Sequence, residues 1–200
     1  MNEPQAAIDA INACDPRLHN REPLALAQGR KAEAWVERLD PDASLALRLA
    51  ARAHHLRRWE LPRPSYPSGR AGYLRWRRDQ RKRHGRDLLE VLSKSGVPDS
   101  VASRASEIVT KKGLGSDPEV QTFEDAVSLT FLETELQPML DRFNDDNKAA
   151  DIVAKTLTKM SDAGTQHAQG LGANLDERSR NVITQATERH NLEAIQQSHH

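Results

Sequence analysis

The stretch Leu45-Ala-Leu-Arg-Leu-Ala-Ala-Arg-Ala-His-His-Leu-Arg-Arg-Trp59 decides the fold class. When successive residues are placed 100° apart, its apolar side chains form one arc about 80° wide. The arc consists of Leu45, Leu49, Ala53 and Leu56. Elsewhere alanine, leucine, arginine and glutamate dominate, β-branched residues are scattered, and apolar–polar alternation with a period of two is absent. The sequence therefore predicts an all-α protein.

Helical patterns recur along the chain between clear stop signals. Asp40-Pro41-Asp42 ends one helix and caps the next, and the proline-rich residues 61–67 cannot continue a helix. From about Gly164 the chain becomes polar, with few large apolar residues. We therefore predict a helical domain over residues 1–165 and a polar tail over 166–200 that is disordered or loosely helical and adds little core. The expected helices span 3–14, 23–39, 43–59, 69–95, 98–112, 117–135 and 145–163.

Composition limits the class of protein. The 200 residues include 37% hydrophobic side chains, and no apolar run approaches the roughly 18 residues that cross a bilayer. The N-terminal residues show no export signal, so we expect a cytoplasmic protein without a membrane partner. Cys14 is the single cysteine, which excludes an intrachain disulfide, and we expect it to be a buried small residue rather than a nucleophile. The sequence leaves the oligomeric state open.

Positive charge is concentrated between Arg48 and Arg86. This basic block holds 13 basic residues against two acids, whereas the whole chain balances 29 basic against 29 acidic residues. Histidine, tryptophan and tyrosine lie within the block, which indicates an anion-binding site. The alternative is that these arginines solvate a long helix and pair with the acidic residues of the stretch 113–147, which holds nine acids and one base.

Two histidines lie on partly apolar helical faces. His55 flanks the apolar arc of its predicted helix, whereas His54 points the other way. His84 shares a face with Leu88, which favours an inward position. We therefore expect His55 and His84 to be the histidines of a site. The alternative for each is a structural histidine, which for His55 means half-buried packing on Trp59.

A third predicted helical face places the carboxylate of Asp125 toward the protein interior. The segment Phe123-Glu124-Asp125-Ala126-Val127-Ser128-Leu129 belongs to a helix that is apolar on two sides, and Asp125 shares one apolar stripe with Leu129. Burying an ionised carboxylate is costly unless a cation or hydrogen-bond donors meet it. A metal ion or an arginine must therefore be near, or the group is protonated. Glu124, on the flank, would act as a base, support a ligand, or be a solvated charge.

Imidazole and carboxylate ligands together suit a divalent transition metal such as Mn, Fe or Zn. Such an ion activates water and polarises a phosphoryl oxygen. We predict that His55, His84 and Asp125 hold the ion and that Glu124 assists as a base, so that Glu124 and Asp125 are the predicted catalytic residues. Basic side chains would bind the phosphate. The candidates are Arg52, Arg58, Arg70, Arg77 and Lys112.

Five segments of the chain carry a family resemblance. They are 51–63, 66–77, 111–114, 121–126 and 155–161. They resemble an uncharacterised family, domain of unknown function 4202, and the resemblance covers roughly residues 5–165. In the family pattern the position of His54 is usually a glutamine. The positions of His55, His84, Glu124 and Asp125 match the pattern.

The order of parts in that family is similar to the HD-domain phosphohydrolases, which have a histidine-bearing helix, a second histidine about 30 residues later and a late helical aspartate. This resemblance implies a single HD-like helical bundle with a metal site. The chain departs from the pattern because Leu56 follows His55 where the superfamily has an aspartate, and because residues 20–53 contain no histidine. Either Glu33, Glu124 or water completes the ligand set, or the fold has lost its metal and kept an anion pocket.

Three functions follow from these features. The leading prediction is a metal-dependent phosphohydrolase that acts on a nucleotide or another small phosphoester. The first alternative is a non-catalytic protein that binds a nucleotide or an RNA, tRNA included, through the basic block. The second is a helical protein-interaction module without a small ligand. The hydrolase predicts a bound metal, the binder predicts a steep salt dependence, and the module predicts neither.

Overall fold

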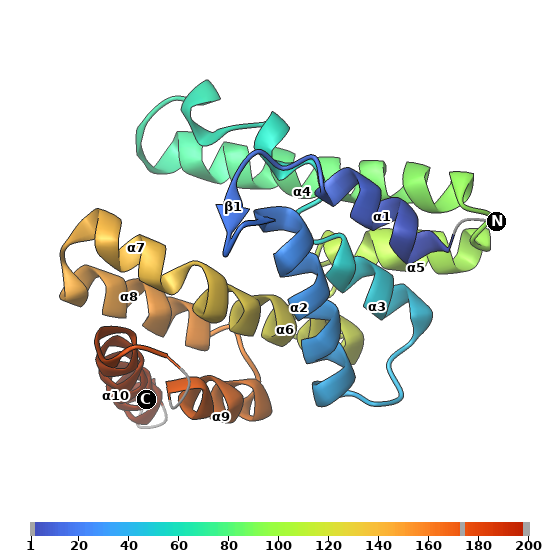
Figure 1. Ribbon diagram of the computed structural model, residues 1–200. Helices are drawn as coiled ribbons and strands as arrows, with labels where there is room; N and C mark the ends of the chain where they lie inside the picture. Colours follow the sequence, from blue (N-terminus) through green and yellow to red (C-terminus); the bar gives the residue numbers. More distant parts are fainter. Residues whose placement is uncertain (1–2, 173–174, 198–200) are drawn as a thin grey trace. The chain divides into compact units, whose positions relative to one another are not determined.

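The computed structural model describes residues 3–172 and 175–197, and it confirms the all-α prediction (Figure 1). In the described residues, the sheet content is a two-stranded antiparallel hairpin of β1 (Leu18–His19) and β2 (Glu22–Pro23). The chain divides into a first unit, residues 1–123, and a second unit, residues 124–200. Across the described part, every helix is either too short or too polar to cross a membrane.

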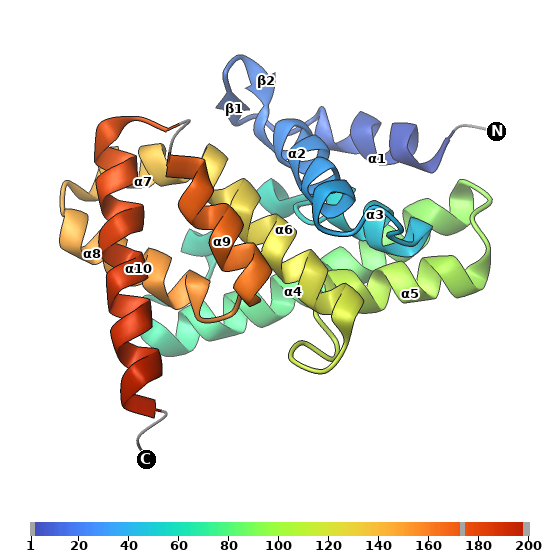
Figure 2. The ribbon, with the colours of Figure 1, turned by 90° about the horizontal axis from the view of Figure 1, so that it is seen from below.

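The first unit is built around α3. This helix packs against α2 and α5, α5 packs against the long helix α4, and α1 contacts α2, α3 and α4 (Figures 1 and 2). Fully buried aliphatic side chains from α3 and α4, such as Leu49 and Leu88, fill the centre. The helices are α1 (Pro4–Asn12), α2 (Leu24–Leu39), α3 (Leu45–Arg52), α4 (Gly69–Lys94) and α5 (Asp99–Val109), with 3-10 turns η1 (Arg58–Glu60) and η2 (Arg63–Ser65).

Local chemistry explains where α2 stops and α3 starts. The helix α2 ends at Leu39, before the predicted stop Asp40-Pro41-Asp42. The hydroxyl oxygen of Ser44 then accepts a hydrogen bond from the backbone N–H of Leu47 at 3.1 Å, which caps the N-terminus of α3.

The end of α3 differs from the prediction of a helix over 43–59. The helix stops at Arg52, and residues 53–57 form turns in which the N–H of Leu56 donates to the carbonyl of Ala53 at 2.9 Å. Arg57 has the left-handed φ of 52°. The segment with the two adjacent histidines is therefore a turn, and the 100° spacing used to assign their faces does not apply to it.

The boundary between the two units falls within the helix α6 (Pro118–Thr134). The second unit contains the remainder of α6 and the helices that follow it in the sequence. In this unit α10 packs along α8, as Figure 2 shows, and buries Val182, Ile183 and Ala186. This differs from the expectation that residues 166–200 add little core. The helices are α7 (Leu136–Phe143), α8 (Asp146–Leu157), α9 (Asp162–Leu171) and α10 (Glu177–Gln197).

Candidate functional site

Three histidines of the first unit lie close together. His54 and His55 follow the end of α3, and His84 lies on α4. The ring centroids of His54 and His55 are 4.2 Å apart, and those of His55 and His84 are 6.5 Å apart. His54 and His84 are buried, while His55 is half-buried. We call these three side chains the histidine cluster.

Each ring of the histidine cluster is oriented by a hydrogen bond from its Nδ1. The acceptors are the carbonyl oxygen of Ala51 for His54, at 2.8 Å, the side-chain oxygen of Gln28 for His55, at 2.6 Å, and the carbonyl oxygen of Leu56 for His84, at 2.9 Å. Since a carbonyl oxygen only accepts, Nδ1 carries the proton in each ring. In the neutral ring, Nε2 then keeps a lone pair that can bind a metal ion or accept a proton.

Burial keeps the histidine cluster neutral. Loss of solvent lowers the pKa of His54 to about 3 and that of His84 to about 4, and it lowers the pKa of His55 well below its ordinary value. The positive charge of Arg58 lowers the pKa of each ring further. At neutral pH the cluster therefore presents uncharged imidazoles beside an arginine.

The turn that carries Arg58 is fixed to α4. The guanidinium carbon of Arg58 lies 4.8 Å from the centroid of the Trp76 ring. Trp76 Nε1 and Gln80 Nε2 each donate to the carbonyl of Leu61 at 2.9 Å. Gln80 is 2% exposed, and among the described residues its Oε1 has no hydrogen-bond partner. A buried acceptor without a donor therefore lies one turn before His84.

The other predicted phosphate-binding residues have different surroundings. Arg52 pairs with Asp9 at 2.7 Å and with Glu33, so its guanidinium is occupied within the fold. Lys112 pairs with Glu107 at 2.6 Å. Arg70 is exposed on α4, and the guanidinium carbon of Arg77 lies 5.8 Å from the Tyr73 ring centroid. Among the predicted phosphate-binding residues, Arg58 is the one whose charge acts on all three rings.

His54 is the member of the histidine cluster that the sequence argument excluded. Helical spacing would place it on the opposite face from His55, but both residues lie beyond the end of α3. In the turn, the two rings come within 4.2 Å of each other. Adjacency of two histidines after an apolar helix was the available signal, and it could be interpreted only with the helix end known.

Metal ligation remains a prediction. Across the residues that the structure describes, no three His, Cys, Asp or Glu side chains are arranged to hold a metal ion. The predicted ligands His55 and His84 belong to the first unit, and Asp125 belongs to the second. Glu33, considered as a completing ligand, pairs with Arg52. Glu124 is buried, and its predicted role as a base also stays a prediction.

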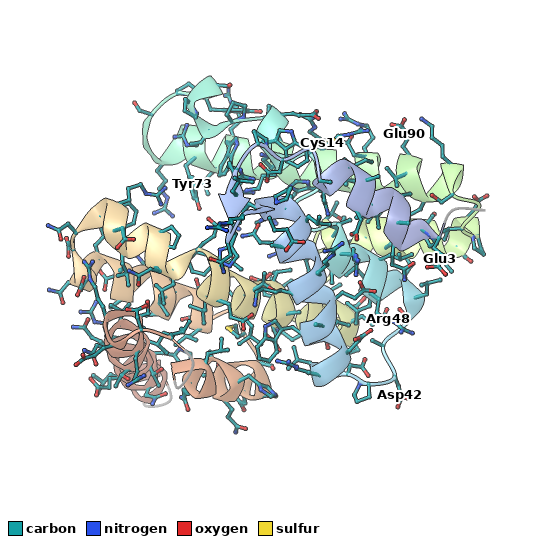
Figure 3. The ribbon with its side chains drawn as sticks, viewed as in Figure 1. Glu3, Cys14, Asp42, Arg48, Tyr73 and Glu90 are labelled. Atoms are coloured by element: carbon teal, nitrogen blue, oxygen red, sulfur yellow. The ribbon has the colours of Figure 1, made fainter. Side chains whose placement is uncertain are left out.

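Cys14 is exposed, which corrects the expectation of a buried residue. It follows α1, and its Sγ lies 3.5 Å from the carbonyl oxygen of Ala10 (Figure 3). Its position at the end of a short helix, rather than within the buried face of one, explains the difference.

In the second unit, Asp125 is buried, as the sequence predicted, and it meets the N-terminus of α9. Its carboxylate accepts hydrogen bonds from the backbone N–H of Ser161 at 2.9 Å and from the Ser161 hydroxyl. The hydroxyl oxygen of Ser161 accepts from the N–H of Gly164 at 3.1 Å and so caps the helix. The positive end of a helix stabilises a carboxylate, so α9 meets part of the requirement that the sequence assigned to a metal or an arginine.

A family model described as a domain of unknown function, DUF4202, matches residues 2–183. The chain belongs to this family. The match includes about half of the residues after 165, which were predicted to lie outside the resemblance, since it extends into α10. Comparisons with the curated proteins and with the solved structures gave no significant match.

Two segments that resemble DUF4202 meet at Asp125. The segment 121–126 supplies the carboxylate, and the segment 155–161 supplies Ser161. Gly164 leaves the space for this contact, because a Cβ at that position would lie 2.6 Å from Cγ of Asp125. The arrangement joins α6 to α9 within the second unit of the DUF4202 domain.

We expect Gly164→Ala to destabilise the second unit by about 2 kcal/mol, because the added methyl group displaces the Asp125 carboxylate from its donors. The second unit contains no tryptophan or tyrosine, so amide hydrogen exchange of α9 and α10 is the appropriate measurement. Gly170→Ala, in the same helix and with no atom within 4 Å of the new Cβ, is the matched control and should be neutral or slightly stabilising. Equal protection in both variants would contradict the packing argument.

Proposed function

We propose that the DUF4202 domain is a metal-dependent phosphohydrolase that acts on a nucleotide or another small phosphoester, with its centre at the histidine cluster. The observation that carries the proposal is the common tautomer of three neutral rings, each anchored through Nδ1 and each keeping Nε2 for a ligand. Such anchoring of the far nitrogen by a carbonyl oxygen is the usual support of a metal-binding histidine.

The residues present fit Mn, Fe or Zn by their chemistry. Nε2 atoms of His55 and His84 would hold the ion, and the unpaired buried Oε1 of Gln80 would accept a hydrogen bond from a water molecule beside it. A bound divalent ion would lower the pKa of a water molecule and polarise a phosphoryl oxygen. Asp125 as a further ligand and Glu124 as a base are the predicted carboxylates of the reaction.

Arg58 would bind and orient the phosphate. Its guanidinium contacts the Trp76 ring, and its charge lowers the pKa of all three rings of the histidine cluster. A guanidinium can donate two parallel hydrogen bonds to phosphate oxygens. Because the three imidazoles stay uncharged at neutral pH, the positive charge at the site comes from arginine, which favours an anionic substrate.

The sequence resemblance to HD-domain phosphohydrolases also supports the proposal. It places a histidine-bearing segment, a second histidine and a late aspartate in the same order along the chain. The chain also departs from the HD-domain pattern, since Leu56 occupies the position of the usual aspartate. A ligand set with fewer protein groups leaves more positions for water and for phosphate oxygens.

Metal content tests the proposal directly. Protein purified without a histidine tag and incubated with Mn, Fe and Zn is expected to retain about one metal ion per chain, as measured by mass spectrometry of the elements. His84→Asn keeps a donor near the carbonyl of Leu56 but lacks Nε2, so at least a tenfold loss of metal affinity is expected. His167→Asn, on an exposed position of α9, is the control and should leave metal content unchanged.

A wild-type protein that stays metal-free under these conditions overturns the proposal. If metal is retained, Asp125→Asn and Glu124→Gln are then compared for metal content and for hydrolysis of a panel of phosphate esters. Loss of metal in Asp125→Asn with native-like hydrogen exchange would support its role as a ligand. Loss of turnover with retained metal in Glu124→Gln would support its role as a base.

A further inference from the structure

The basic block divides into paired and unpaired arginines. In the second half of α4, Arg83 and Arg86 pair with buried Asp87, at 3.2 and 2.9 Å. Arg63 is also occupied, because it donates to the carbonyl oxygens of Tyr66 and Pro67 at 2.9 Å. These contacts stabilise the fold, and they absorb part of the positive charge that the sequence concentrates there.

The first half of α4 has no such compensation. Between Gly69 and Lys82 the chain has six basic residues and one acid, Asp79, which already accepts hydrogen bonds from Tyr66 at 3.0 Å and from Arg78 at 3.3 Å. Five of the six basic side chains are exposed, and four of these five form no ion pair within 4 Å among the described residues. We call the exposed set the α4 cationic face: Arg70, Arg75, Arg78, Arg81 and Lys82.

The α4 cationic face is a continuous stripe. At 100° per residue its five side chains fall within an arc of about 140° and extend over about 18 Å of helix. Gly72 and Gln80 lie on the opposite, buried side. Repulsion among uncompensated charges of one sign favours an anionic polymer as the occupant, because each phosphate neutralises one charge and releases counterions.

An exposed aromatic side chain lies on the flank of α4, about 60° around the helix from the edge of this stripe at Arg70. Tyr73 is 43% exposed and projects from α4, as Figure 3 shows. Its ring lies 6.0 Å from that of Trp76, which the carbonyl of Leu61 anchors, and the Arg77 guanidinium lies 5.8 Å from the Tyr73 centroid. An exposed ring supported by a second ring and an arginine offers a stacking surface for an unpaired base.

We propose that the first half of α4 binds single-stranded nucleic acid, with the α4 cationic face on the phosphates and Tyr73 stacked on a base. A membrane surface fits less well, because Leu74 is the one large aliphatic side chain exposed among residues 69–82 of the described chain, and interfacial helices need a broad apolar face. This site lies on other side chains than the histidine cluster and does not depend on the proposed hydrolase.

Fluorescence anisotropy with a labelled oligouridine of about 20 nucleotides tests the proposal. The triple variant Arg75→Gln, Arg81→Gln, Lys82→Gln should bind at least tenfold more weakly at about 0.1 M salt, and the slope of log Kd against log salt should fall by about 2. The matched control Lys94→Gln, Lys148→Gln, Lys155→Gln removes the same charge from exposed positions elsewhere and should change Kd less than about twofold.

Tyr73→Ala should weaken binding by about tenfold, whereas Tyr73→Phe should retain affinity. Equal loss in the two triple variants would show a generic charge effect and overturn the proposal. So would tighter binding to a duplex of the same sequence, or binding to phosphatidylserine vesicles without binding to RNA. The first triple variant should bind as much metal as the wild type. A wild-type protein that binds RNA but no metal would contradict the proposal of a hydrolase and leave the proposal of RNA binding intact.

Discussion

Acidification from about pH 6.5 to 4.5 is expected to lower the free energy of unfolding of the first unit by about 4 kcal/mol through His54 and His84 alone. The unfolded chain takes up protons on these rings below about pH 6.5. The folded unit does not, because burial lowers the pKa of His54 to about 3 and that of His84 to about 4. Their stabilising contribution is therefore complete above pH 6.5 and is lost progressively as the pH falls, toward 4 for His84 and toward 3 for His54.

Urea unfolding followed by tryptophan fluorescence measures this effect. The three tryptophans, Trp35, Trp59 and Trp76, all belong to the first unit, so their emission reports on that unit. The double variant His54→Asn, His84→Asn keeps side-chain donors but does not titrate at these two positions, so the dependence on pH should become much shallower and retain only the part that His55 contributes.

His167→Asn is the control for this pH experiment and should retain the wild-type dependence. An unchanged slope in the double variant would assign the acid loss to carboxylates instead of to the histidine cluster. It would also remove the argument that the rings are neutral in the folded state, on which the metal proposal depends.

Arg52→Met is expected to destabilise the first unit by about 3 kcal/mol, because it leaves two carboxylates partly buried without their cation. Arg52 is 19% exposed, and it joins Asp9 of α1 and Glu33 of α2 to the end of α3. Burial by itself would raise the pKa of Asp9, but hydrogen bonds and charge from Arg52 and Arg30 lower it. The same tryptophan-monitored unfolding gives the free energy.

Arg30→Met is the matched control for Arg52→Met. Arg30 also pairs with Asp9, at 3.2 Å, but its side chain is 51% exposed. Solvent screens such a pair, so the expected loss is below about 1 kcal/mol. Similar losses in the two variants would show that burial does not distinguish the two contacts. Unchanged stability in Arg52→Met would return Arg52 to the set of candidate phosphate-binding residues.

Several helices could be predicted from the sequence because local residues end them. The expected spans 23–39, 69–95 and 117–135 lie within one residue of α2, α4 and α6 at each end. Prolines and capping residues act within one or two turns of their own position. The ends of these helices are therefore determined by residues close to them in the sequence.

The end of α3 could not be predicted in this way. No proline or glycine lies between Arg52 and Arg57, and the turns are held by contacts with other parts of the unit, such as the hydrogen bond from His55 to Gln28. The core contribution of α10 was also missed. Its buried residues Val182, Ile183 and Ala186 are few, and they acquire their role from α8.

The candidate site was predictable in its residue types and less so in its partners. Burial of His84 and Asp125 follows from the apolar faces that carry them. The donors to Asp125 come from Ser161, 36 residues later, and depend on where α9 begins. The pairing of Arg52 with Asp9 likewise joins residues 43 positions apart. Sequence periodicity indicates which side of a helix is buried, but it does not identify the groups that lie across from it.

Because Cys14 is exposed, the protein can be labelled with a thiol-reactive probe at a single position. Because no other thiol occurs in the 200 residues, a maleimide dye or a nitroxide reacts at one place, just after α1. Its side chain is a weak donor to Ala10 and supports no ion pair, so labelling should leave the fold intact. A labelled protein would then report encounter with an oligonucleotide or a metal ion in real time, without any change to its sequence.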